Sequence, residues 1–211
     1  RTGVDNVIGV VVQKVGDPFF AEVVEEIEIE ANRRGIGVIV GSTHGELERE
    51  NEVVQGFKQR RVAGMIITPQ DVDYSFMKDM KIPSVFIDRS PKNFKGDVVR
   101  VDDVDGGRMA TEHLIKHGHT RIAFFGDRLK IMTTKLRLDG YKKALNDAKI
   151  KINDDLIFLD LDEERKAEAA MREAIASKNP PTALFAAKSE LGVGLIRAMH
   201  AAKRQDIAMI S

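Results

Sequence analysis

Residues 7–20 read VIGVVVQKVGDPFF, an apolar run followed by a short polar stretch and two adjacent aromatic residues. The run from Val7 to Val12 is typical of a buried β-strand, and Phe19 and Phe20 fall where a helix would begin. In open α/β sheets, ligands bind just beyond the carboxyl ends of the strands, and aromatic faces there suit flat or ring-shaped small molecules. The segment therefore points to binding rather than to catalysis.

The same alternation of strand and helix patterns continues to the end of the chain. Further short apolar runs indicate strands at residues 38–40, 65–67, 84–87, 98–101, 122–125, 156–159, 183–186 and 207–210. Apolar residues at helical spacing indicate amphipathic helices between them, as at residues 20–31, 138–148 and 191–202. Continuous apolar strands joined by helices predict parallel sheets that are covered on both faces, which is a doubly wound α/β fold.

The nine predicted strands could form one wide sheet, but a sheet usually holds about 4 to 6 strands, so two smaller sheets are a reasonable alternative. A boundary fits after the helix at 104–117, since Gly118 is a favoured residue just past a helix C-terminus and a new strand and helix series begins at Arg121. We expect residues 1–118 to form an N-terminal lobe and residues 119–211 a C-terminal lobe. The chain stops directly after an apolar run, so we expect the second lobe to be incomplete.

The composition excludes several classes of partner. The 33 basic residues balance the 33 acidic ones, so no overall positive field would draw the chain to nucleic acid or to an anionic membrane. Cysteine is absent, which excludes disulfides and thiolate metal sites. No apolar run approaches the roughly 18 residues of a membrane span, and no signal pattern opens the sequence. We expect a soluble, cytoplasmic protein without a membrane partner.

Common catalytic patterns are missing from the sequence. It has no Gly-Lys pair for a phosphate-binding loop, no dinucleotide-type glycine spacing and no Gly-x-Ser-x-Gly nucleophile elbow. His113 and His117 lie one helical turn apart, a spacing that could hold a metal, but the interaction of a histidine with the end of a helix dipole explains them more simply. We expect no enzyme, no catalytic residue, no cofactor and no metal.

An aspartate cluster stands where a strand meets a helix. Asp102, Asp103 and Asp105 could cap the helix, accept the protons of sugar hydroxyls or bind a hard cation. Because a magnesium site normally needs further phosphate or carboxylate ligands, we favour a hydroxyl-rich ligand over a metal. Of Phe19 and Phe20, we expect one ring in the core and the other facing a cleft.

Cationic residues also lie near the predicted strand ends. Arg89 comes directly after Asp88 at the end of one strand, and Arg137 lies at the start of a helix. Each could hold hydroxyls or an anion, or form a surface ion pair instead. Lys188-Ser189 follows the strand at 183–186, where a lysine could contact an anion or face solvent.

Several stretches, taken in order, resemble the LacI/GalR family of bacterial transcription regulators, specifically its periplasmic-binding-protein-like effector domain. The likeness spans nearly the whole chain and is carried by Arg1-Thr2-Gly3, Asp17-Pro18-Phe19-Phe20, Arg61-Val62-Ala63-Gly64-Met65-Ile66-Ile67, Asp88-Arg89, residues 106–114, residues 117–122 and Arg137-Leu138-Asp139-Gly140-Tyr141. Each stretch is weak alone, but together and in this order they are specific.

The resemblance implies two Rossmann-like lobes of the type I periplasmic-binding-protein fold that enclose a small effector, and a homodimer. It also implies an N-terminal helix-turn-helix headpiece that reads operator DNA and that is absent from this chain. The family's final strands and helices are missing as well, and the connection near Lys203-Arg204-Gln205 is shorter than is usual in the family.

The resemblance also implies roles by position. Phe19 and Phe20 match the family's aromatic contacts, Asp105 matches a polar contact, and Arg137 matches an arginine that holds effector hydroxyls. The expected ligand-binding residues are Asp17, Phe19, Phe20, Asp88, Arg89, Asp105, Arg137, Lys188 and Ser189.

Two positions depart from the family pattern. Lys188-Ser189 stands where many members have Asn-Asp, and Asp162 stands near a position that is aromatic in some members. Because a lysine in place of an amide favours a phosphate or carboxylate group, we expect a phosphosugar or sugar acid as well as a neutral sugar among the effectors.

The function that the resemblance implies is the effector-binding and dimerisation domain of a LacI-type regulator, expected to be a repressor. Effector binding would shift the lobes and change the affinity for operator DNA. Two alternatives remain open: a sugar-binding protein of an ABC uptake system, and an enzyme that uses the aspartate cluster around a metal. Arg1-Thr2-Gly3 and the missing signal sequence favour the regulator.

Overall fold

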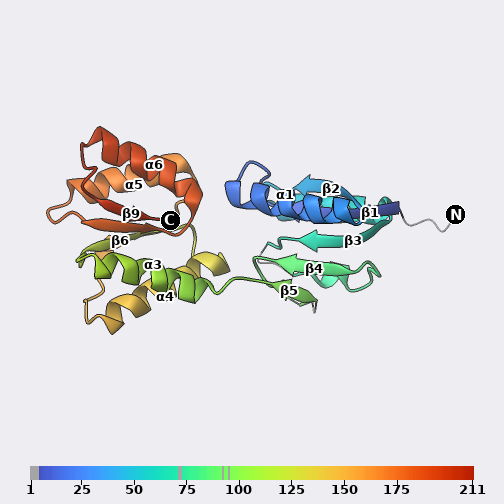
Figure 1. Ribbon diagram of the computed structural model, residues 1–211, viewed down its shortest axis with the longest axis horizontal. Helices are drawn as coiled ribbons and strands as arrows, with labels where there is room; N and C mark the ends of the chain where they lie inside the picture. Colours follow the sequence, from blue (N-terminus) through green and yellow to red (C-terminus); the bar gives the residue numbers. More distant parts are fainter. Residues whose placement is uncertain (1–4, 71–72, 92, 95) are drawn as a thin grey trace. The chain divides into compact units, whose positions relative to one another are not determined.

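The chain divides into two compact units, with the boundary between Arg100 and Val101. The computed structural model describes residues 5–70, 73–91, 93–94 and 96–211. Each unit is a parallel β-sheet with helices packed against it (Figure 1), so the predicted α/β class is confirmed. The stretch Arg1-Thr2-Gly3, which contributed to the family resemblance, lies outside the described residues.

Unit 1 contains a five-stranded sheet with the strand order β2-β1-β3-β4-β5. Its elements are β1 (Asp5–Val12), α1 (Pro18–Arg33), β2 (Gly37–Ser42), α2 (Leu47–Gln59), β3 (Val62–Ile67), the short 3-10 helix η1 (Ser75–Met77), β4 (Ser84–Ile87) and β5 (Asp97–Val99). All the pairings are parallel, and β1 pairs with both β2 and β3. The apolar run at 7–12 therefore lies inside the sheet, where both of its faces are covered.

Successive residues of β1 face opposite sides of the sheet. Val10 and Val12 share a core cluster with Phe20 of α1. Val11 shares a different cluster with Phe57 of α2. Since a strand alternates its side chains, α1 and α2 cover opposite faces of the sheet in unit 1.

Unit 2 contains a four-stranded parallel sheet with the order β7-β6-β8-β9. Its elements are α3 (Asp103–Lys116), β6 (Ile122–Phe125), α4 (Met132–Asp147), η2 (Asp154–Leu156), β7 (Ile157–Phe158), α5 (Glu164–Ala176), β8 (Ala183–Ala186), α6 (Ser189–Ala201) and β9 (Ala208–Ile210).

Adjacent phenylalanines of β6 divide the core of unit 2 into two layers. Phe124 packs in a cluster with Leu114 of α3 and Leu138 of α4. Phe125 packs in another cluster with Met171 of α5. Figure 1 shows α3 and α4 on one side of this sheet and α5 and α6 on the other. Among the described helices, none is both long and apolar enough to cross a membrane.

The position of α3 differs from the sequence prediction. The boundary lies between Arg100 and Val101, not after Gly118, so α3 belongs to unit 2. The reason is that α3 packs against α4 and contributes Leu114 to the core of unit 2. Gly118 does follow the helix and has a φ of 88°, but a glycine that ends a helix does not tell which sheet the helix covers.

The strand predicted at 98–101 also differs in its surroundings. It is β5, the edge strand of its sheet, where it pairs with β4. Val98 and Val99 are exposed, and so is Val101 beyond the end of the strand. The apolar run therefore predicted the strand correctly but not its burial. An edge strand has a neighbouring strand on one side only, so it can remain exposed.

Candidate functional site

Each sheet has one point at which the chain reverses the direction of its winding. In unit 1 the chain passes from β1 to β2 on one side and then to β3 on the other, so this switch point lies between β1 and β3. In unit 2 the same reasoning places it between β6 and β8. Doubly wound sheets bind ligands outside the carboxyl ends of strands at such points. The predicted residues lie in loops that follow strands or in the helices that come next.

Asp17 caps the helix that follows β1. Its Oδ1 accepts a hydrogen bond from the backbone N–H of Phe19 at 3.0 Å, and Pro18 begins the helix. The rings of Phe19 and Phe20 meet edge to face, with centroids 5.1 Å apart. Phe20 is 4% exposed and Phe19 is 46% exposed. Phe20 is therefore the predicted core ring, and Phe19 is the one that a ligand could reach.

Asp88 and Arg89 form a buried ion pair directly after β4. Arg89 Nε donates a hydrogen bond to Asp88 Oδ2 at 2.9 Å, and less than a tenth of either side chain is exposed. Asp88 has a φ of 68°, in the left-handed region that residues other than glycine seldom adopt. Strained backbone of this kind occurs at binding and catalytic sites, and the role of the pair in ligand binding stays a prediction.

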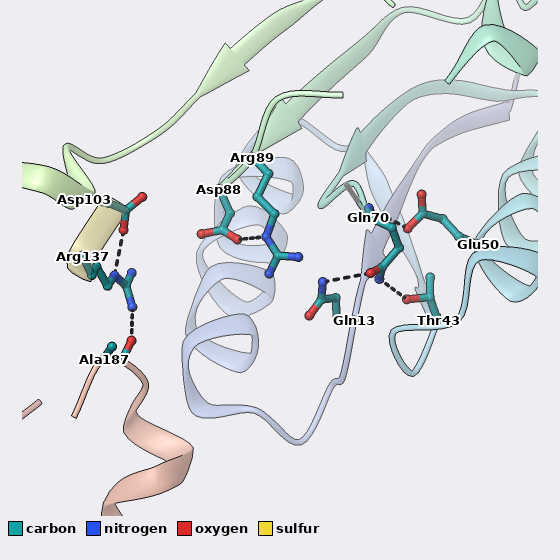
Figure 2. A network of polar contacts seen from close by, with 9 residues as sticks. All are labelled: Gln13, Thr43, Glu50, Gln70, Asp88, Arg89, Asp103, Arg137 and Ala187. Atoms are coloured by element: carbon teal, nitrogen blue, oxygen red, sulfur yellow. Dashed lines mark hydrogen bonds and ion pairs between the residues drawn. The ribbon is translucent and has the colours of Figure 1, made fainter. Parts of the chain in front are cut away.

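Three polar residues close to Arg89 were not predicted: Gln13, Thr43 and Gln70, from the loops after β1, β2 and β3 (Figure 2). Gln70 Nε2 donates to Thr43 Oγ1 at 3.5 Å, and the amides of Gln13 and Gln70 lie 3.5 Å apart. With its oxygen toward Arg89, the amide of Gln13 accepts from Arg89 Nη1 at 2.5 Å and from Nη2 at 3.1 Å. The sequence signal for all three was a polar side chain just beyond a predicted strand.

Glu50 lies next to Gln70, in the first turn of α2, and is 0% exposed. Its Oε2 accepts a hydrogen bond from the backbone N–H of Gln70 at 3.1 Å, while Oε1 has no hydrogen-bond partner among the described residues. Burial raises the pKa of Glu50 to about 7, although the Gln70 N–H and the charge of Arg89 act to lower it.

Arg137 is held in unit 2 by two acceptors (Figure 2). Its Nε donates to Asp103 Oδ1 at 2.8 Å, and its Nη1 donates to the carbonyl oxygen of Ala187 at 2.6 Å. The Asp103 side chain is 3% exposed and that of Arg137 is 32% exposed. Since Ala187 directly follows β8, Arg137 lies at the carboxyl end of this sheet, as predicted, and part of it remains accessible.

Two glycines allow Asp103 and Arg137 to meet. A Cβ atom added at Gly107 of α3 would overlap the backbone carbonyl of Arg137, and one added at Gly140 of α4 would overlap the backbone carbonyl of Val104. The backbones of α3 and α4 therefore touch at this crossing. The ion pair joins the same two helices.

The three clustered aspartates have separate partners. Asp102 is the N-cap of α3, and its Oδ1 accepts from the backbone N–H of Asp105 at 2.9 Å. Asp103 binds Arg137. Asp105 accepts from Arg108 Nε and Nη2 at 2.9 and 2.6 Å, and hydrogen bonds from Arg108 to Asp105 and Glu112 raise the pKa of that guanidinium. Asp105 thus has a partner on its own helix, and its contact with an effector stays a prediction.

Lys188 and Ser189 begin α6 at the carboxyl end of β8. Lys188 is the N-cap residue, and Ser189 is the first residue of the helix and is exposed. The ammonium group of Lys188 pairs with the carboxylate of Glu190. The predicted position is confirmed at the end of the strand, but the charge of the lysine is compensated locally.

A second Asp-Arg dipeptide follows β6. Asp127 Oδ1 accepts from the backbone N–H of Arg128 at 2.6 Å and from Arg128 Nε at 3.1 Å, and Asp127 is buried. The contact between Nε and the carboxylate is like that of Asp88 and Arg89, but the Arg128 side chain is 43% exposed. It was not predicted, although two Asp-Arg dipeptides just beyond two apolar runs are visible in the sequence.

Every cation described above at a strand end or beside one has a carboxylate partner. The pairs are Arg89 with Asp88, Arg128 with Asp127, Arg137 with Asp103, and Lys188 with Glu190. Such pairs offer N–H donors and carboxylate acceptors to hydroxyl groups without adding net charge. Within the described ranges, no three His, Asp or Glu side chains gather in a way that could hold a metal ion.

Comparison with known proteins gives the same family over nearly the whole chain. A family model described as periplasmic binding proteins and sugar binding domain of LacI family matches residues 5–210. The HTH-type transcriptional repressor PurR of Pasteurella multocida is 29% identical over 196 residues, which make up 91% of this chain and 59% of that repressor. The ribose operon repressor of Escherichia coli K12 is 29% identical over 210 residues, 96% of this chain and 64% of that protein. The chain thus spans less than two thirds of the length of these relatives.

A solved structure agrees with the fold. The crystal structure of transcription regulator CcpA of Lactococcus lactis matches with a TM-score of 0.86 at 21% identity, over 98% of this chain and 78% of that one. The predicted fold class is thereby supported by an experimental structure as well as by the sheet topology.

Proposed function

This chain belongs to the family of periplasmic binding proteins and LacI-type sugar-binding domains, and from that membership we propose that it is the effector-binding domain of a LacI-type transcriptional repressor. Its effector is a small, neutral, hydroxyl-rich sugar, and binding shifts the population between states with different affinity for operator DNA. The relatives are named as transcriptional repressors, which favours a regulator over an uptake protein and over an enzyme.

The proposed ligand contacts are argued for each unit by itself, at the carboxyl ends of its own strands. Arg89 and Arg137 donate to hydroxyl groups, while Phe19 offers an apolar ring face to the carbon side of a sugar ring. Asp17 supports Phe19 through the helix cap. The other proposed ligand residues are Asp88, Asp105, Lys188 and Ser189, whereas Phe20 lies in the core and packs edge to face against the ring of Phe19.

The observation that carries the choice of a neutral sugar is that Arg89, Arg128, Arg137 and Lys188 each pair with a carboxylate. A phosphate carries a charge of about −1.5 to −2 at neutral pH, and it is best bound where cations exceed anions. The second candidate effector, a phosphosugar or sugar acid, is supported by Lys188 at the start of α6. Because Glu190 pairs with this lysine, we rank the anionic effector second.

The test compares D-ribose with D-ribose 5-phosphate by thermal shift and titration calorimetry, since a ribose operon repressor is among the relatives. Other pentoses and hexoses are screened in the same pairs, neutral and phosphorylated. We expect the neutral member of the best pair to bind more tightly. Tighter binding of the phosphorylated member would make the anionic candidate the correct one.

The Glu190→Gln variant tests the charge argument directly. Removing the carboxylate leaves the charge of Lys188 without this partner, so we expect affinity for the phosphorylated sugar to rise about tenfold relative to the neutral one. Glu173→Gln on α5 is the matched control, because it makes the same change in net charge at an exposed position. An equal gain in both variants would show that overall charge, not this site, governs anion binding.

The assignment of the site is tested with Arg137→Ala. Loss of a charged hydrogen-bond donor to a buried hydroxyl costs about tenfold or more in affinity. Full affinity in this variant would show that Arg137 does not contact the effector.

The whole regulator has further proposed properties. We propose that it is a cytoplasmic homodimer that binds operator DNA through a helix-turn-helix segment. The DNA contact is supported by the names of the relatives, an HTH-type transcriptional repressor and an operon repressor. Sedimentation velocity over a range of protein concentrations tests the dimer. A single species with the mass of one chain at all concentrations would contradict it for this part of the protein.

A further inference from the structure

Glu50 is a buried acidic residue that the proposed effector contacts leave without a role. It is on α2 and is not among the strand-end loops, yet one of its oxygens reaches such a loop at the backbone N–H of Gln70. A carboxyl group taken out of water is costly unless it is satisfied by partners, and Oε1 has no hydrogen-bond partner among the described residues. A leucine of similar size would avoid this cost, so stability alone does not explain an acid here.

A continuous chain of contacts leads from Glu50 to Arg89. Glu50 holds the backbone of Gln70 at 3.1 Å. The side chain of Gln70 lies against the amide of Gln13, at 3.3 Å from the oxygen of Gln13 in the orientation that faces Arg89. That oxygen accepts hydrogen bonds from both Nη atoms of Arg89. Figure 2 shows these residues side by side in unit 1.

The contacts constrain the direction of the Arg89 guanidinium from two sides. Arg89 donates a hydrogen bond from Nε to Asp88. On another edge of the guanidinium, Nη1 and Nη2 donate to the oxygen of Gln13. Asp88 directly precedes Arg89 in the chain. Gln13 contacts Gln70, which is itself hydrogen-bonded to Glu50 and to Thr43.

We propose that Glu50 is a positioning residue for Arg89: its buried carboxyl group anchors Gln70, and Gln70 and Gln13 in turn set the orientation in which Arg89 meets a ligand. Glu50 itself contacts no effector. The inference rests on the proposed function, because it assigns a use to the orientation of Arg89 in effector binding.

The first test needs no sugar. NMR measures the hydrogen-exchange rate of the Arg89 Nε–H in the whole chain and in the variants Glu50→Leu and Glu50→Gln. Leucine removes the acceptor for Gln70, so we expect exchange at Arg89 to accelerate about tenfold, whereas glutamine keeps an acceptor and restores slow exchange. Glu52→Leu is the matched control on the same helix, because Glu52 is exposed. Equal exchange rates in Glu50→Leu and wild type would overturn the proposal.

The thermal midpoint of each variant separates positioning from simple support of the fold. A structural role predicts that loss of Arg89 order follows loss of stability. Positioning predicts faster Arg89 exchange even where Glu50→Leu unfolds at the same temperature as wild type or at a higher one. Should Glu50→Leu fail to fold, Gln70→Ala interrupts the same series of contacts at a partly exposed position. It too should accelerate exchange at Arg89. Slow exchange in Gln70→Ala would overturn the proposal.

The second test uses D-ribose titrations in a double-mutant cycle with Arg89→Ala. We expect Glu50→Leu to weaken D-ribose binding about tenfold in the wild-type background and to have no further effect when Arg89 is absent. If Arg89→Ala binds D-ribose as wild type does, the proposed site is wrong. If Arg89→Ala loses binding but Glu50→Leu does not, only the role of Glu50 is wrong. The exchange measurement decides the role of Glu50 even if D-ribose does not bind.

Discussion

Arg137 shows what a single side chain needs in order to present donors at a strand end. Its guanidinium is held by the Asp103 carboxylate and by the Ala187 carbonyl, so its direction is fixed before any ligand arrives. Fixed donors lose less side-chain entropy on binding than mobile ones do. The buried acid beside an arginine is therefore as important to the site as the arginine itself.

Replacing Asp103 by alanine should weaken both the fold and the site. The change leaves the Arg137 charge with one neutral acceptor in place of a carboxylate. We expect a loss of about 2 kcal/mol in the free energy of unfolding, at the lower end for a broken pair because Arg137 is about a third exposed. Urea denaturation measures it, and Asp105→Ala is the control, because Asp105 is on the same helix and its side chain is 47% exposed against 3% for Asp103. Equal losses in the two variants would contradict a special role for Asp103.

Glu50 should make stability depend on pH in an unusual direction. Its pKa is about 7 in the folded chain against 4.5 ordinarily, so between these values the folded state binds more protons than the unfolded state. The free energy of unfolding therefore falls as pH rises through this window, by about 3 kcal/mol in total from this group. Denaturation at pH 5 and pH 8 should show a smaller fall in Glu50→Gln than in wild type. The exposed Glu52→Gln should behave as wild type, and an unchanged slope in Glu50→Gln would refute the assignment.

Sequence patterns located many of the strand-end residues but not their partners. Asp88 and Arg89 adjoin a strand in the sequence, so their place at the sheet edge follows from the strand prediction. The partner of Arg137 could not be foreseen in this way, because Asp103 is 34 residues away and meets it only through the packing of two helices. Glu50 was hidden for the same reason, since its contact with Gln70 is made across the fold.

The close crossing of α3 and α4 depends on two glycines. Gly107 and Gly140 each face a backbone carbonyl of the other helix, and either Cβ would overlap it. Helices that approach this closely fix the relative positions of the side chains at the crossing. The ion pair between Asp103 and Arg137 is one such fixed contact.

Gly107→Ala should separate the two helices, whereas Gly106→Ala should not. The neighbours of Gly107 are backbone atoms that cannot rotate away, so we expect a loss of about 2 to 3 kcal/mol in the free energy of unfolding. At Gly106 nothing lies within 4 Å of an added Cβ, and alanine there should stabilise α3 by about 0.5 to 1 kcal/mol. Circular dichroism during urea denaturation measures both. A similar effect of the two changes would contradict the close crossing.

The presence of each strand was easier to predict than the elements that pack beside it. Each predicted strand is present, because a run of apolar residues is a local signal. The burial of β5 and the membership of α3 were not predictable, since they depend on which other elements lie beside them. Val99 is as apolar as the buried valines of β1, yet it lies on an edge strand.

The molecule has a separate core in each of its two units. Phe86 lies in a core of unit 1, and Phe124 lies in a core of unit 2. The sequence suggested this organisation from the number of strands, and the family resemblance predicted the same two lobes. The sequence analysis placed the boundary between the two units after α3, whereas it lies before α3.

Truncating one core should loosen its own unit first. Phe124→Ala removes a fully buried ring and should cost about 4 kcal/mol in unit 2. Native-state hydrogen exchange should then show faster exchange of protected amides in residues 101–211 and little change in β1 and β3. The reciprocal variant Phe86→Ala should reverse the pattern. Faster exchange throughout the chain in both variants would show that the two cores unfold as one.

The exposed ring of Phe19 offers an optical reporter. The chain contains no tryptophan, and its two tyrosines, Tyr74 and Tyr141, are buried. An indole introduced by Phe19→Trp would therefore be the only tryptophan in the chain, and its fluorescence could be excited selectively. Its emission maximum and quenching by iodide would follow solvent access at the start of α1, so a fluorimeter could screen compound libraries without any labelled sugar.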